Sequence, residues 1–159
     1  MGDEILSLES ENILSNLQDG PFDKFVKDFC GSNKRIVGSV IDGKTNGPYK
    51  VFGEDGRLLD KGYFKNGLKH GKVESFWKDG SISAITNYDE GIQSGEFKSY
   101  YLSGKLRQLG ENSDSRSKGT HWCETFTEEG ILLSRSENQK IVYEHPQRFD
   151  IDPGAPYEL

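Results

Sequence analysis

Apolar and aromatic residues recur in short runs along the middle of the chain, and glycines separate these runs at regular intervals. Gly47, Gly71, Gly95 and Gly119 are each 24 residues apart. The apolar positions keep this spacing in three equivalent sets: Phe52, Phe76 and Tyr100; Leu58, Ile82 and Leu106; Val40, Phe64 and Tyr88. The period predicts about three similar structural units, followed by a less regular fourth unit in which Gly130 comes two residues late.

Each unit contains two sites of chain reversal. Asn66-Gly67 and Asp79-Gly80 favour tight hairpin turns, because those turns need residues that tolerate positive φ. Between these turns, Val73 and Ser75 alternate with Glu74 and Phe76, which is the period of a β-strand. The expected fold class is therefore mainly β, a single-layer antiparallel meander of about eight to ten strands built from 24-residue hairpin repeats.

The N-terminal region has a different pattern, and residues 3–31 predict helices. Phe22, Phe25, Val26 and Phe29 have the spacing of one helical face, and Pro21 precedes them at a first helical position. A helix over residues 21–30 is expected to cap an edge or a face of the sheet. Three parts result: a helical cap (1–34), a repeat sheet (35–144) and an extended C-terminal tail (145–159).

Composition narrows the functional classes. The 159 residues include 19 glycines and only 33% hydrophobic residues, which favours one turn-rich domain with a large wetted surface. The net charge of −6 disfavours direct binding of nucleic acid, which needs clustered Lys and Arg. No apolar run is long enough to span a bilayer, and the N-terminus lacks a secretory signal. Cys30 and Cys123 form no disulfide framework, so a soluble, cytoplasmic protein is expected.

Residues with catalytic or metal-binding chemistry are sparse. His121 and Cys123 alternate on a predicted strand and could share a face, but a zinc site needs three or four ligands. Two partly buried strand residues are the favoured interpretation. His70 occupies the turn position that Asn46 and Ser94 hold in the neighbouring units, which favours a turn role. We therefore expect no enzyme activity, no metal and no cofactor.

The surface of the sheet is the remaining candidate for function. One aromatic stripe contains Phe52, Phe76 and Tyr100, and a second contains Val73, Trp77, Phe97 and Tyr101. The sequence does not tell which stripe is covered, and sheet curvature could also pack both. Acidic residues near the stripes would attract a basic protein. The predicted partner-binding residues are Phe52, Glu74, Phe76, Trp77, Asp79, Glu96, Tyr100 and Tyr101.

The stretches "GYFKNGLKHGKVESFWKDGSI" and "NYDEGIQSGEFKSYYLSGKL" resemble MORN repeats, and they are most similar to the bacterial variant. The resemblance covers residues 36–112 well and 113–135 poorly. Small bacterial proteins of this variant resemble antitoxins and immunity proteins of polymorphic toxins. The resemblance thus implies a protein that occludes the active site or substrate groove of a cognate, basic toxin domain, as a monomer or in a 1:1 complex. The alternative is a repeat scaffold for protein–protein or membrane-proximal assembly.

Overall fold

The computed structural model describes residues 17–27, 31–113, 121–138 and 140–145, and every regular element in these ranges is a β-strand. The strands are β1 (Gly20–Lys27), β2 (Asn33–Ile41), β3 (Lys44–Thr45), β4 (Gly47–Phe52), β5 (Leu58–Lys65), β6 (Leu68–Lys69), β7 (Gly71–Phe76), β8 (Ile82–Asp89), β9 (Ile92–Tyr100), β10 (Leu106–Asn112), β11 (Trp122–Phe126), β12 (Leu132–Glu137) and β13 (Lys140–Glu144).

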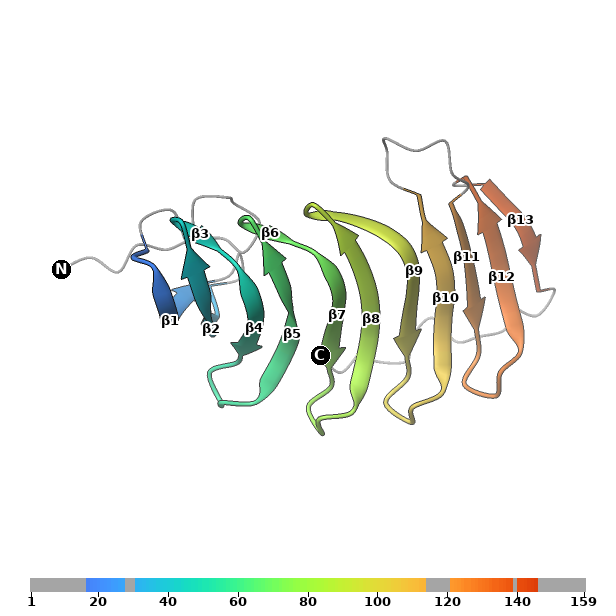
Figure 1. Ribbon diagram of the computed structural model, residues 1–159. Helices are drawn as coiled ribbons and strands as arrows, with labels where there is room; N and C mark the ends of the chain where they lie inside the picture. The colour runs from blue at the N-terminus through green and yellow to red at the C-terminus, as the bar shows by residue number, and fades with distance from the viewer. Residues whose placement is uncertain (1–16, 28–30, 114–120, 139, 146–159) are drawn as a thin grey trace.

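All strands belong to one sheet with antiparallel pairing (Figure 1). Eleven strands follow one another in chain order from β1 to β13, while the short strands β3 and β6 pair with β2 and β5 beside this path. The predicted antiparallel meander is therefore confirmed.

Two kinds of tight turn connect the strands, one kind at each end of the strands. At the upper edge in Figure 1, two-residue loops join paired strands, and both loop residues have positive φ, as in Asn66-Gly67. At the lower edge, Trp77 N donates to Ser81 O at 2.8 Å and Gly80 N donates to Trp77 O at 3.0 Å. These bonds, with positive φ at Gly80, define a three-residue hairpin loop. The same pair of bonds closes the loops at Gly56, Gly104 and Gly130.

The fourth unit forms a hairpin like the others, although its sequence is less regular. Thr127 N donates to Ile131 O at 2.8 Å, and Gly130 N donates to Thr127 O at 3.0 Å. The two additional residues lie before this hairpin, in the connection from β10 to β11. Phe97 pairs with Thr86 across the two-residue turn, and Cys123 pairs with Gly110 at the equivalent place in the fourth unit. The sequence separation of Cys123 and Gly110 is two residues greater than that of Phe97 and Thr86.

The helix predicted over residues 21–30 is wrong, because β1 occupies residues 20–27 and pairs with β2 from Gly20↔Val40 to Lys27↔Asn33. Phe22 and Val26 are buried, but Phe25 is 75% exposed. A spacing of four residues fits one face of a strand as well as one face of a helix. Residues 1–16 and 28–30, which include the rest of the predicted helical segment, lie outside the described residues.

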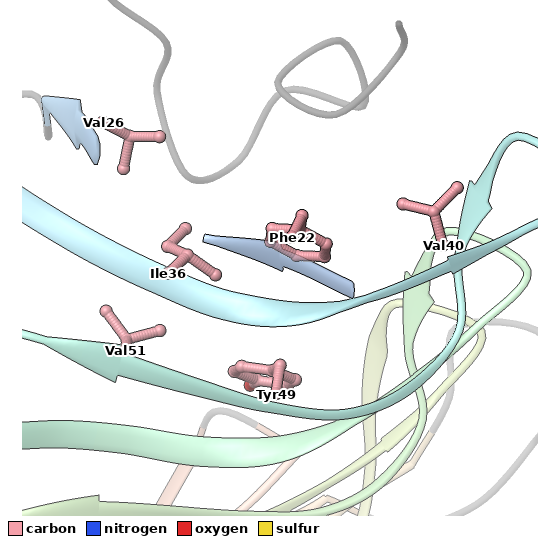
Figure 2. Packing of buried hydrophobic residues seen from close by; sticks show 6 residues of the cluster. All are labelled: Phe22, Val26, Ile36, Val40, Tyr49 and Val51. Atoms are coloured by element: carbon pink, nitrogen blue, oxygen red, sulfur yellow. The ribbon is translucent and has the colours of Figure 1, made fainter. Parts of the chain in front are cut away.

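Buried apolar side chains gather at the N-terminal end of the sheet. Six of them form a cluster on one side of three strands, as Figure 2 shows, and they are Phe22, Val26, Ile36, Val40, Tyr49 and Val51. Leu17 and Phe64 pack against this cluster, and the ring centroids of Tyr49 and Phe64 are 4.3 Å apart. Val73 on β7 is also buried. We call this side of the sheet the core face and the opposite side the open face.

Neighbouring upper turns are linked to each other by hydrogen bonds. Gly67 N donates to Thr45 O of the preceding unit at 2.8 Å, and Gly91 N donates to Lys69 O at 2.8 Å. Among the described residues, no unit of this kind precedes the first turn. There Gly43 N donates to Asp19 Oδ1 at 2.8 Å and Asp42 N donates to Asp19 Oδ2 at 3.1 Å. The Asp19 carboxylate therefore supplies the acceptors that a further repeat would have provided.

Replacing Asp19 with alanine is expected to lower the free energy of unfolding by about 1 kcal/mol, because two turn amides lose their acceptor while water remains accessible. Urea denaturation measures this loss. The matched control is Asp42→Asn, which keeps a residue suited to positive φ and should change stability by less than about 0.5 kcal/mol. Equal losses in the two variants would contradict the capping role of Asp19.

Candidate binding surface

The first predicted aromatic stripe lies on the open face, beside the lower loops. Phe52 pairs with Leu58, Phe76 with Ile82, and Tyr100 with Leu106. The fourth hairpin adds a further pair of this kind, Phe126 and Leu132, which sequence spacing missed because the unit is displaced by two residues. We call these four pairs the open-face row. Its four aromatic side chains are partly exposed, and they lie at equivalent places in consecutive hairpins.

Cationic side chains lie over two rings of the row. The Arg35 guanidinium carbon is 5.9 Å from the centroid of Phe52, and Lys61 Nζ is 5.3 Å from the centroid of Phe76. A cation over the face of an aromatic ring is attracted by the ring quadrupole. Both cations are themselves ion-paired, Arg35 with Asp23 and Lys61 with a carboxylate on β7, so the rings of the row lie beneath charges that are largely balanced.

Glu74, a predicted partner-binding acid, is engaged within the sheet. Its carboxylate forms an ion pair with Lys61, at 2.7 Å, and a second one with Lys72. Hydrogen bonds from these two ammonium groups hold the pKa of Glu74 below its usual value. Glu74 thus fixes Lys61 above the Phe76 ring and adds little unbalanced negative charge to the surface.

Asp79 and Glu96 also have local partners. Asp79 Oδ1 accepts hydrogen bonds from Ser81 Oγ at 2.6 Å and Ser81 N at 2.9 Å, and these bonds lower the pKa of Asp79. Glu96 Oε1 lies 2.7 Å from Lys98 Nζ, and this contact raises the pKa of Lys98. Both acids are exposed. Their contact with a partner stays a prediction, but the negative rim is partly neutralised by neighbouring donors.

The second predicted stripe belongs to the core face. Val73 is buried and pairs with Thr86, which in turn pairs with Phe97. Tyr101 Oη donates to the carbonyl oxygen of Phe126 at 2.7 Å, and burial raises the pKa of this tyrosine. Trp77 begins the equivalent loop one unit earlier, and its Nε1 is buried without a hydrogen-bond partner among the described residues. Trp77 and Tyr101 directly follow two members of the row, Phe76 and Tyr100, so the alternation of a β-strand directs them toward the opposite face.

A series of glycines explains which face is packed. A Cβ atom at Gly38 would lie 2.9 Å from the Phe22 ring, and one at Gly62 would lie 2.9 Å from both Tyr49 Cε1 and Val73 Cγ2. At Gly110 it would lie 2.5 Å from the Phe97 ring. Gly38, Gly62 and Gly110 occupy equivalent positions of the 24-residue repeat, and Thr86 occupies that position in the third unit. The repeat of glycine at this position is therefore visible in the sequence. The missing side chains let large residues of neighbouring strands lie close against the core face.

The cysteine and histidines that the sequence analysis considered for catalysis or metal binding are partly buried or contact neighbouring residues. Burial raises the pKa of the Cys123 thiol, which disfavours the reactive thiolate. His121 Nδ1 accepts a hydrogen bond from Ser113 N at 3.2 Å, and His70 Nδ1 lies 3.3 Å from Asp89 Oδ1. Within the described ranges, no group of three or more His, Cys, Asp or Glu residues is arranged to hold a metal ion. Cys30 lies outside these ranges.

The described part of the chain also holds no helix with the length and hydrophobicity that a membrane span requires. No curated protein matches the chain. The sequence model of one family, the MORN repeat variant, matches residues 69–90 and 93–111. The first match covers the hairpin of β7 and β8, and the second covers that of β9 and β10. Together with the strand meander, these matches identify MORN-type repeats in the middle of the sheet.

Proposed function

We propose that this protein is a binding protein that holds a partner protein against the open-face row. The observation that carries this proposal is the alignment of partly exposed Phe52, Phe76, Tyr100 and Phe126 in successive hairpins. Aromatic side chains beside arginine are the composition that protein interfaces favour. Repeats of the MORN type are in keeping with protein–protein or membrane-associated roles.

We further propose that the partner is a toxin domain and that the protein acts as its immunity protein or antitoxin. The repeat variant supports this role by resemblance, and the net charge of −6 suits a basic partner. Three of the four lower loops beside the row present exposed carboxylates, at Asp55, Asp79 and Glu128-Glu129. In this mechanism, the bound sheet blocks the active site or substrate groove of the toxin sterically, and this chain performs no chemistry.

A scaffold role is the second candidate. The row continues through four hairpins, from β4 to β12, without a pair that interrupts it. An extended row of this length fits an elongated segment of a partner as well as it fits a compact domain. Binding of an elongated segment without any effect on a toxin would favour this candidate.

Substitution of two aromatic residues tests the binding surface. Phe76→Ala combined with Tyr100→Ala should weaken binding of a toxin domain encoded beside this chain by at least about a hundredfold, because central aromatic residues dominate interface energies. Isothermal titration measures the affinity, and growth of cells that express the toxin domain measures protection. The double variant should lose protection that the wild-type protein gives.

The control variant is Ile41→Ala, which removes an exposed apolar side chain at an upper turn, away from the row. It should bind and protect like the wild-type protein. If the wild-type protein neither binds nor protects, the immunity role is rejected. If the double variant folds and still protects, a different surface must be used.

A further inference from the structure

The strand at the C-terminal end of the sheet is unusually exposed. All five residues of β13 are exposed, including Ile141 at 60%, Val142 at 55% and Tyr143 at 40%. In the strand order of the described residues, β13 pairs with β12 on one side and with no strand on the other. An apolar strand at the edge of a sheet is a template for pairing with another chain.

The strand at the opposite end differs in both packing and composition. β1 buries Phe22 and Val26 in the core cluster, and it carries Pro21 and Lys24 among its exposed positions. Proline and lysine on an edge strand oppose pairing with further strands. The apolar centre of β13 contains neither, so the two ends of the sheet are not equivalent.

The sequence of β13, Lys-Ile-Val-Tyr-Glu, is complementary to itself in an antiparallel arrangement. If two copies pair around Val142, Lys140 of each copy lies opposite Glu144 of the other. Ile141 then lies opposite Tyr143, and the two Val142 residues face each other. Cross-strand pairs of opposite charge and of aromatic with β-branched residues are both favourable.

The pairing of β13 with β12 leaves the central residue of the strand exposed. Ser136 pairs with Ile141 and Arg135 pairs with Tyr143, so the register shift leaves Val142 without a Cα partner on β12. This places an apolar, β-branched residue at the centre of the strand with more than half of its surface in contact with water. A second copy of β13 would place its own Val142 beside this one, and the two strands would exchange hydrogen bonds through their outward N–H and C=O groups.

We propose that β13 pairs edge to edge with β13 of a second copy, so that two sheets join into one continuous sheet across a two-fold axis. A two-fold contact uses the same surface on both copies and therefore closes as a dimer. This arrangement leaves the open-face row accessible on both copies. It is an alternative to the monomer or 1:1 complex expected from the sequence, and it does not depend on the identity of the partner protein.

Sedimentation of the full chain across protein concentrations tests this proposal. The wild-type protein should shift from monomer to dimer as its concentration rises, and hydrogen exchange at β13 should slow in parallel. Lys140→Glu places like charges opposite each other at both ends of the paired strands, as does Glu144→Lys, so each variant should weaken dimerisation by about tenfold. The double variant Lys140→Glu/Glu144→Lys restores opposite charges and should recover the wild-type dimer.

Lys24→Glu on β1 is the matched control, and it should dimerise like the wild-type protein. A monomer at every concentration would overturn the proposal. So would a dimer that neither single variant weakens, or a double variant that stays as weak as the single ones. Growth into species larger than a dimer would indicate pairing of β13 with β1, which also contradicts the two-fold arrangement.

Discussion

Replacing Gly110 with alanine is expected to lower the free energy of unfolding by about 3 kcal/mol. The new Cβ atom would lie 2.4 Å from the carbonyl oxygen of Trp122 and 2.5 Å from the Phe97 ring. The ring could rotate away, but the carbonyl oxygen belongs to the backbone of β11. Because Gly110 pairs with Cys123 on that strand, relief of the clash requires β10 and β11 to separate locally. Urea denaturation followed by tryptophan fluorescence measures the loss.

Gly53→Ala is the matched control for this substitution. Like Gly110, Gly53 has no positive φ, so alanine introduces no backbone strain at either position. The nearest atom to a Cβ at Gly53 is Asp55 Oδ1 at 3.1 Å, and this carboxylate can move into solvent. The control should lose less than about 0.5 kcal/mol. Similar losses in the two variants would show that close packing at Gly110 is not the cause.

The turns could be predicted from the sequence because their chemistry is local. Asn66-Gly67 has the residues that a two-residue hairpin loop needs, and the structure repeats this turn 24 residues later at Glu90-Gly91, where glutamate is less typical. The edge strand β1 could not be predicted in this way. Its apolar residues fit a helix or a strand, and the choice depends on the long-range pairing with β2.

The candidate site was only partly predictable for a related reason. Sequence spacing placed Phe52, Phe76 and Tyr100 in one stripe, as the structure does. Which face of the sheet is exposed could not be predicted, because it depends on where large side chains pack over glycine. The positions of Gly38, Gly62 and Gly110 contain that information, and it becomes clear once the strands are placed in register. The ion pair of Glu74 with Lys61 could not be predicted for the same reason, since the two residues are brought together by the pairing of neighbouring strands.

Two phenylalanines of β1 provide a direct test of strand against helix at the N-terminal edge. Phe22→Ala should cost about 3 kcal/mol or more, because this side chain is only 7% exposed and its ring lies against Gly38 in the core cluster. Phe25→Ala should cost less than about 0.5 kcal/mol, since this side chain points away from the core face and is 75% exposed. Urea denaturation of both variants gives the comparison. A helix with Phe22, Phe25 and Val26 on one buried face would instead make the two losses similar, and that result would contradict β1 as the edge strand.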